Sequence, residues 1–155
     1  MGERSPINDT DATGMFIGLR PDTTRSQMIL AVLEGVSCAI RDNIEVAKSI
    51  GIDIKTSYIC GGGAKSKLWR KLISNILNIE LEIPHAEEGP GYGSAMLSMV
   101  GAGEYKTVTE CASQLLSVKD KIIPEKELVN LYEERYNKFK QIYPAVKNLY
   151  KTIKE

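Results

Sequence analysis

Residues 55–66 read KTSYICGGGAKS, a short run of β-forming residues that leads directly into three glycines. A helical pattern of apolar residues begins near Lys67. A strand, a glycine turn and a helix commonly present main chain to a phosphate or a nucleoside, because glycine lacks a Cβ and a helix start offers unpaired N–H groups. The same pattern also fits a tight crossover turn without a ligand, and it matches neither a Walker A loop nor G-x-G-x-x-G.

Composition favours an ordinary soluble, single-domain protein. The chain has 155 residues, of which 43% are hydrophobic and 26% charged, a length that can bury a sizeable core. Lys+Arg and Asp+Glu both number 20, so no net field favours nucleic acid or an anionic membrane. No apolar run approaches the roughly 18 residues that span a bilayer, and residues 1–6 form no signal region. We therefore expect a cytoplasmic protein that binds neither nucleic acid nor membrane.

The three cysteines, Cys38, Cys60 and Cys111, lie far apart in apolar surroundings. An odd number without C-x-x-C argues against a disulfide framework and against a zinc site, so all three are interpreted as small buried residues. The single histidine, His85, has no partner for nucleophilic or metal chemistry and is interpreted as a loop residue. We expect no metal site in this chain.

The clearest helix in the sequence runs from about residue 21 to residue 50. Thr24 and Gln27 have the spacing of a capping box, and apolar residues recur at i, i+3, i+4 and i+7 from Ile29 onward. Another face carries a stripe of small residues at 31, 35 and 38. Such a stripe lets a second element approach closely, although Gly35 could equally be tolerated without a role.

Glu34 and Arg41 lie toward one outer side of this helix. We expect them to form a solvated ion pair.

The rest of the chain alternates short elements with turns. The pattern predicts a strand over 80–84, a helix that starts in the glycine-rich segment after Glu87 and Glu88, a short helix over 109–116, a lysine-containing loop over 117–124, and a C-terminal helical stripe of aromatic residues interrupted at Pro144. Glu87 and Glu88 suit the dipole of the helix that follows them. Trp69, in the helix after the three glycines, is interpreted as a packing residue.

Several catalytic motifs are missing. Residues 9–13 read DTDAT, but no apolar strand precedes them, so they are interpreted as a solvated turn. No D-x-G-x-T phosphate loop is present, and Asp42, Asp53 and Asp120 lack a convincing catalytic setting. We therefore assign no catalytic residue. A nucleotide site here would be half a site, and its other half would come from elsewhere.

Five motifs together resemble one family in their order and spacing. They are GERSP at 2–6, GMFIGL at 14–19, AVLEGVS at 31–37, GGGAKS at 61–66 with Trp69-Arg70, and EGP at 88–90 with GSA at 93–95. From residue 2 to about residue 150 the chain resembles the C-terminal portion of an FGGY-family carbohydrate kinase, most of all the xylulokinases of that family.

The resemblance implies a fold and an activity. The fold would be α/β, the C-terminal half of an actin-like (ribonuclease H-like) ATPase domain, with an incomplete sheet and several helices. Residues 1–155 would form a single, partial C-terminal nucleotide-binding domain of a two-domain sugar kinase. The full-length enzyme would transfer the γ-phosphate of Mg-ATP to a sugar hydroxyl, with D-xylulose converted to D-xylulose 5-phosphate, and this fragment alone would be inactive.

The resemblance also implies the binding residues. Gly61, Gly62, Gly63 and Ala64 would hold the adenosine end of ATP and approach the phosphates, and Lys67 would lie near the adenine or ribose. The phosphate loop, the catalytic aspartate, the Mg²⁺ ligands and the sugar-binding residues would belong to the missing N-terminal domain. A homodimer is one candidate assembly.

The chain departs from the family at two positions, with Thr13 where arginine is common and Gly91 where alanine is common. The role of the loop around Thr13 is therefore open. Two alternatives remain. One is another FGGY kinase, for glycerol, gluconate or ribulose. The other is a stand-alone, non-enzymatic α/β interaction module whose glycines serve turns only.

Overall fold

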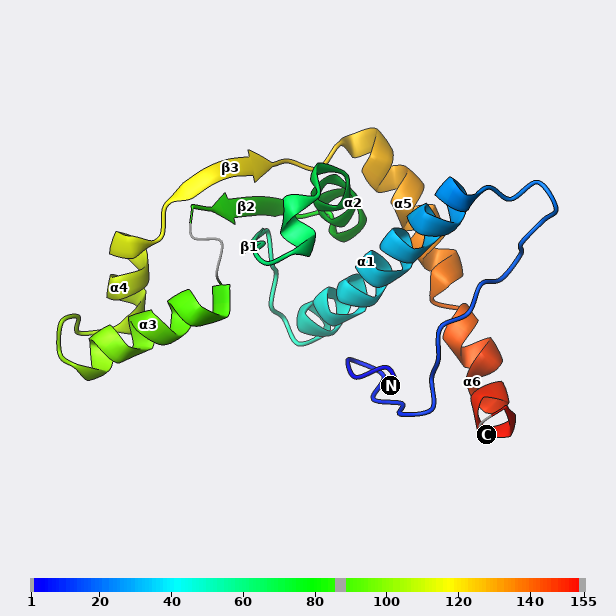
Figure 1. Ribbon diagram of the computed structural model, residues 1–155, viewed down its shortest axis with the longest axis horizontal. Coiled ribbons are helices and arrows are strands. Elements are labelled where there is room, and N and C mark those ends of the chain that lie inside the picture. The colour runs from blue at the N-terminus through cyan, green and yellow to red at the C-terminus, as the bar shows by residue number, and fades with distance from the viewer. Residues whose placement is uncertain (1, 86–88, 154–155) are drawn as a thin grey trace.

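The computed structural model describes residues 2–85 and 89–153, which form a mixed α/β structure (Figure 1). Its elements, in chain order, are α1 (Arg25–Ser49), β1 (Thr56–Tyr58), the 3₁₀ turn η1 (Gly63–Lys65), α2 (Lys67–Leu77), β2 (Glu80–Pro84), α3 (Gly89–Gly101), α4 (Val108–Leu115), β3 (Val118–Ile122), α5 (Lys126–Phe139) and α6 (Ile142–Thr152). A small sheet with several helices confirms the α/β class predicted from the sequence.

The sheet has the order β1-β2-β3, with β1 parallel and β3 antiparallel to β2. On β2, Leu81 is buried in the core that α2 and α5 share, while Glu80 and Glu82 form ion pairs with Lys121 of β3 at 2.8 and 2.6 Å. The sheet thus has one apolar face and one charged face. Within the described residues β1 pairs with β2 alone and forms an edge of the sheet.

Helix α2 forms the centre of the core. Ser66 caps its start by accepting a hydrogen bond from the backbone N–H of Trp69, as the helical pattern from Lys67 predicts. Its buried residues pack with β2 and with tyrosines of α5; they include Leu72, Ile73, Ile76 and Leu77. Helix α2 directly follows the glycine turn. Because its apolar face is buried, the turn is held at one end of the sheet.

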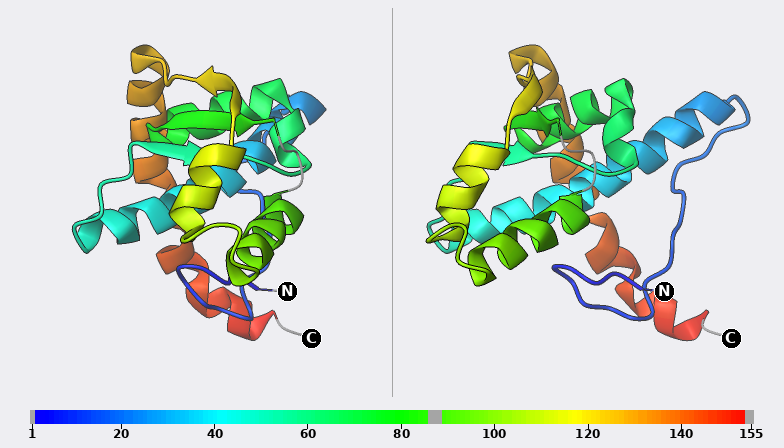
Figure 2. Two further views of the ribbon diagram at one scale, coloured as in Figure 1. Left: turned by 90° about the vertical axis from the view of Figure 1, so that its left-hand side faces the viewer. Right: turned by 60° about the vertical axis from the view of Figure 1, so that its left-hand side comes forward.

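Helix α1 crosses beside α2 and α5 (Figures 1 and 2). The predicted capping box of Thr24 and Gln27 is present. Only part of the apolar pattern faces the core, because the stripe at 29, 32, 36 and 40 is exposed by 52, 50, 43 and 38%. These four residues, Ile29, Val32, Val36 and Ile40, are called the exposed stripe below.

The stripe of small residues on α1 changes environment along the helix. Ala31 is exposed, a Cβ placed on Gly35 would meet no atom within 4 Å, and Cys38 is buried in the core. Burial raises the pKa of the Cys38 thiol to about 11. The small residues therefore do not form one close contact within the described chain.

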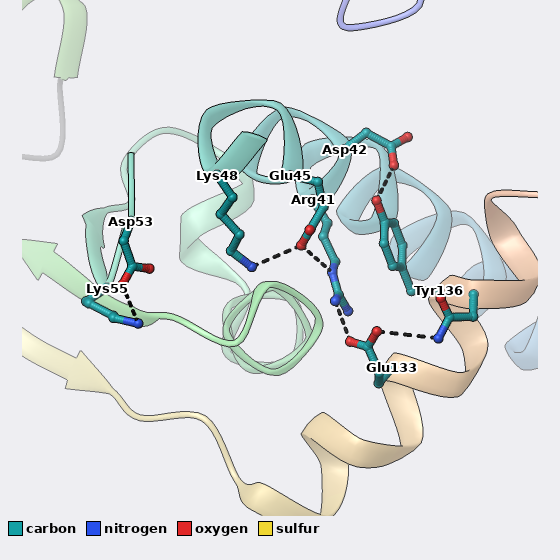
Figure 3. A network of polar contacts seen from close by, with 9 residues as sticks. Arg41, Asp42, Glu45, Lys48, Asp53, Lys55, Glu133 and Tyr136 are labelled. Atoms are coloured by element: carbon teal, nitrogen blue, oxygen red, sulfur yellow. Dashed lines mark hydrogen bonds and ion pairs between the residues drawn. The ribbon is translucent and has the colours of Figure 1, made fainter. Parts of the chain in front are cut away.

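The predicted solvated ion pair of Glu34 and Arg41 is wrong. Arg41 is buried, pairs with Glu133 of α5, and lies with its guanidinium 4.1 Å from the ring centroid of Tyr136 (Figure 3). Glu34 instead pairs with Arg135 of α5 at 2.6 Å. Both side chains join α1 to α5, a contact between segments that lie about 100 positions apart in the sequence.

One other prediction for the C-terminal half needs correction. Residues 117–124 contain the strand β3, which pairs with β2, where the sequence pattern predicts a loop. Helix α3 starts at Gly89, within the glycine-rich segment, as predicted. The expectation for Glu87 and Glu88 falls outside the described residues. The C-terminal stripe divides as predicted, with Pro144 in the first turn of α6, where its missing N–H costs little.

The N-terminal arm runs beside α6 (Figure 1), where Tyr143 donates a hydrogen bond of 2.6 Å to Asp9. This bond lowers the pKa of Asp9 and raises the pKa of Tyr143 to about 12. The stability that ionised Asp9 gives to the arm should be fully present above pH 4 and lost as the pH falls through the lowered pKa of Asp9. The stability that the protonated Tyr143 hydroxyl gives to the arm should be fully present below pH 10 and lost as the pH rises through the raised pKa of about 12.

We expect amide hydrogen exchange of residues 3–11 to accelerate at both pH extremes, relative to the intrinsic rate at each pH. Tyr143→Phe should show the faster exchange at neutral pH already. Equal exchange of the arm in the wild type and in Tyr143→Phe would contradict this anchoring.

In the part of the chain that the structure describes, no helix is both long and apolar enough to cross a membrane.

Candidate functional site

The glycine turn between β1 and α2 is built from local hydrogen bonds. The N–H groups of Ala64, Lys65 and Ser66 each donate to the carbonyl three residues earlier, at 3.1, 3.2 and 3.2 Å. Gly61 has φ of +87°, a left-handed conformation that favours glycine. Gly62 has helical angles, φ −59° and ψ −43°, that any residue can adopt. Backbone conformation therefore demands glycine at 61 and not at 62.

Gly63 is required by close packing. A Cβ placed on this residue would lie 2.6 Å from Cζ3 of Trp69, a separation that real Cβ atoms do not show. Trp69 thus covers the turn from the α2 side, which confirms its interpretation as a packing residue. A Cβ on Gly62 would meet nothing within 4 Å. Gly61 is required by its backbone conformation and Gly63 by the contact with Trp69. Within the described chain, no conformation or contact requires glycine at position 62.

A cavity of about 360 Å³ lies between this turn and the adjoining ends of β2 and β3. Of the residues predicted to bind a nucleotide, Gly61, Ala64 and Lys67 lie on its wall. Gly62 and Gly63 belong to the same turn but do not line the cavity. The predicted set is thus brought to one place, with three of its five members facing the cavity.

The charged side chains around the cavity are mostly cationic. Among the described residues, four cationic side chains line it together with one carboxylate, a formal excess of three positive charges (four minus one); they are Lys65, Lys67, Arg70 and Lys119, with Asp120 as the carboxylate. The Nε of Arg70 is buried and has no hydrogen-bond partner among the described residues. Because a buried, unpaired donor is unfavourable, an anionic or acceptor-rich ligand suits this wall.

Of these five charged residues, sequence reasoning predicted a binding role for Lys67 alone and missed the other four. Lys65 and Arg70 belonged only to family motifs, and Lys119 and Asp120 fall in the segment that was predicted to be a loop. Residues 118–122 read VKDKI, with a β-branched residue at each end. These two residues are the signal that could have predicted the strand, and a strand here would have placed its charged residues near the turn.

Cys60 also lines the cavity, which corrects the prediction that all three cysteines are buried. Cys60 is exposed, whereas Cys38 and Cys111 are buried, and all three are free thiols. In the described residues no group of three or more His, Cys, Asp or Glu side chains could hold a metal ion. The described residues that line the cavity suit a nucleotide-like anion by their charge.

Comparison with known proteins gives this site its context. Residues 1–102 match the model for the FGGY family of carbohydrate kinases, C-terminal domain. The chain belongs to the FGGY family of carbohydrate kinases. A xylulose kinase of Staphylococcus epidermidis is 34% identical over 148 residues, which cover 96% of this chain and 30% of the relative. The chain therefore spans about 30% of the length of this FGGY relative.

Solved FGGY structures agree with the fold. A crystal structure of a xyloylose kinase from Brucella ovis matches with a TM-score of 0.82 and 35% identity, over 93% of this chain and 30% of the other. A gluconate kinase from Lactobacillus acidophilus has a TM-score of 0.86 over 97% of this chain and 30% of its own, at 22% identity, and so shows the fold alone. The three-stranded sheet and its helices are thus part of the actin-like, ribonuclease H-like fold, as predicted.

Proposed function

We propose that this chain is the ATP-binding C-terminal part of an FGGY sugar kinase that transfers the γ-phosphate of ATP to a sugar hydroxyl. The observation that carries the proposal is the cavity beside the triglycine turn, which the described residues line with four cationic side chains and one carboxylate. ATP carries several negative charges, and its phosphates and ribose offer many hydrogen-bond acceptors. The buried Nε of Arg70 supplies a donor that needs such an acceptor.

In this proposal the chain's own residues bind and orient the nucleotide. Gly61, Gly62, Gly63 and Ala64 hold the adenosine against bare main chain, and Lys67, at the start of α2, lies beside the adenine or ribose. ATP supplies the phosphoryl group, and Mg²⁺ accompanies it with ligands outside these 155 residues. The catalytic base and the sugar contacts also lie outside them, so the chain alone is inactive.

Conversion of D-xylulose to D-xylulose 5-phosphate is the proposed reaction, because the relatives that are 34 and 35% identical to this chain over the aligned residues are xylulose kinases. The enzyme would act in D-xylose metabolism in the cytoplasm. A phosphorylation screen with the longer polypeptide that contains this domain tests the proposal, with D-xylulose, glycerol, gluconate and ribulose as substrates. Turnover of one of the other three would replace D-xylulose, and turnover of none would leave the non-enzymatic interaction module.

The site itself can be tested in this chain through Cys60. Iodoacetamide at pH 8 should modify Cys60 within minutes and spare Cys38 and Cys111, because only Cys60 is exposed and the raised pKa of Cys38 keeps its thiol protonated. ADP should slow the modification of Cys60, measured by mass spectrometry of the digested protein. Adenosine, which lacks phosphate, is the control and should protect less. Equal rates with and without saturating ADP would contradict a nucleotide in this cavity.

We also propose that the remainder of the FGGY polypeptide covers the exposed stripe of α1. The stripe presents four apolar side chains, and about 70% of the length of the curated relative lies outside this chain. Beside the stripe, Ala31 and the open space at Gly35 allow a close approach.

Gly35→Ala tests this covering by the sign of its effect. In the 155-residue chain it should stabilise by about 0.5–1 kcal/mol, because alanine favours the helix and meets no neighbour. In the longer polypeptide the added methyl should destabilise, since the covering element approaches closely. Urea unfolding measures both, and deuterium exchange of α1 gives a second comparison. The same stabilisation in both forms, or equal protection of α1 in both, would argue against a close contact here.

A further inference from the structure

The turn Gly63–Lys65 follows Gly62, and as a glycine this residue has no side chain that could cap the turn. Its three backbone bonds join residues 61–66 to one another. Such bonds shape the turn but do not fix where it lies relative to the core. Packing against the core contributes to its placement beside the cavity.

The packing partner is the indole ring of Trp69. Placed on Gly63, a Cβ would lie 2.6, 2.9 and 3.4 Å from three carbons of the six-membered part of that ring. The ring therefore lies directly against the main chain of Gly63. Any rotation of the ring toward the turn would move Gly63, and with it Ala64 on the cavity wall.

A buried serine on α1 holds the ring in place. The Nε1–H of Trp69 donates to Oγ of Ser37 at 3.2 Å, and Ser37 is completely buried. The hydroxyl of Ser37 donates in turn to the carbonyl of Leu33 at 2.7 Å, so its direction is fixed. At the other end, the backbone N–H of Trp69 donates to the Ser66 side chain. A chain of contacts thus runs from α1 through Ser37 and Trp69 to the glycine turn.

We propose that Trp69 is a positioning residue for the nucleotide and that Ser37 of α1 sets its orientation. The inference rests on the proposed ATP-binding function of the turn. It adds that helix α1, which does not line the cavity, determines nucleotide affinity through one hydrogen bond and one ring contact. A change in α1, such as its covering by another part of the polypeptide, would then reach the turn through Ser37.

A double-mutant cycle in the 155-residue chain tests the ring contact, with ADP as the probe and NMR titration as the measurement. Gly63→Ala should weaken ADP binding about tenfold in the wild-type background. In the Trp69→Leu background it should cause no further loss, because the atoms it collides with are gone. Gly62→Ala is the matched control: its Cβ meets nothing, Trp69 included, so its effect should be the same in both backgrounds.

Ser37→Ala tests the hydrogen bond and should weaken ADP binding about fivefold at a temperature where thermal unfolding shows the variant to be folded. Ser49→Ala, which changes an exposed serine of the same helix, should have no effect. In the longer polypeptide, Ser37→Ala should raise the KM for ATP and leave the KM for the sugar unchanged. A loss of folded protein would instead lower the apparent kcat alone.

The failures are distinguishable. Wild-type chain that binds no ADP would overturn both the proposed function and this inference. Wild-type chain that binds ADP, with equal losses from Gly63→Ala in the two backgrounds or unaltered affinity in Ser37→Ala, would overturn the positioning role alone.

Discussion

Replacing Ile76 by alanine is expected to lower the free energy of unfolding by about 3 kcal/mol. Ile76 lies in the last turn of α2, has no exposed surface, and belongs to the core that joins α2 to β2 and α5. Removal of its three outer carbons would leave a cavity that the surrounding helices cannot fill, since they are held by their own buried contacts. Because α2 carries Lys67 and Arg70, the same change should also loosen the cavity.

Urea unfolding measures this effect as a lower midpoint at an unchanged slope. Ile123→Ala is the matched control, because the same atoms are removed from a side chain that is 70% exposed. It should change the stability by no more than about 0.5 kcal/mol. Similar losses for the two variants would mean that α2 does not form the centre of the core.

Helices α1 and α2 were predictable because their signals are local. Each has a capping residue next to its first turn, and each carries apolar residues at helical spacing. The strand β3 was missed because three of its five residues are charged. In the structure Lys121 pairs with Glu80 and Glu82 on the charged face of the sheet, so the charges are compatible with an outer strand. That pairing depends on β2, about 40 residues away, which a local pattern does not reveal.

Arg41 shows the same limit. Its position on α1 suggested a solvated side chain. Helix α5, about 90 residues later in the sequence, instead buries Arg41 against Tyr136 and beside Glu133 (Figure 3). For the candidate site, sequence reasoning located the turn correctly at residues 61–66. It could not locate Lys119 and Asp120, because only the antiparallel pairing of β2 with β3 brings them to the turn.

The cavity and the exposed stripe of α1 suit different kinds of binding partner. The cavity is lined by charges that suit a small anion, whereas the exposed stripe of α1 is apolar and suits another part of the same polypeptide. Ser37 is buried on α1 and its hydroxyl contacts Trp69, so the element that carries the stripe also touches the turn. We therefore expect covering of α1 to change nucleotide affinity by the same factor as nucleotide changes the covering, as reciprocal coupling between sites requires.

Gly62→Ala is the second large expected effect, a loss of about tenfold in ADP affinity without a loss of stability. Gly62 has helical backbone angles and open space where a Cβ would lie, so alanine fits the ligand-free fold without strain. No described residue requires glycine at 62, and the proposed approach of a nucleotide to bare main chain would account for it. A methyl group there would displace the nucleotide from the turn.

Calorimetric or NMR titration with ADP measures the affinity, and urea unfolding measures the stability of the same variant. Gly35→Ala is the control, since it adds the same methyl to a helix that does not line the cavity and should leave the affinity unchanged. Unchanged affinity in Gly62→Ala would mean that the nucleotide does not lie on this turn. A loss of affinity together with a loss of stability would mean that glycine at 62 serves the fold, and would return the triglycine segment to the simple crossover turn that its sequence also allows.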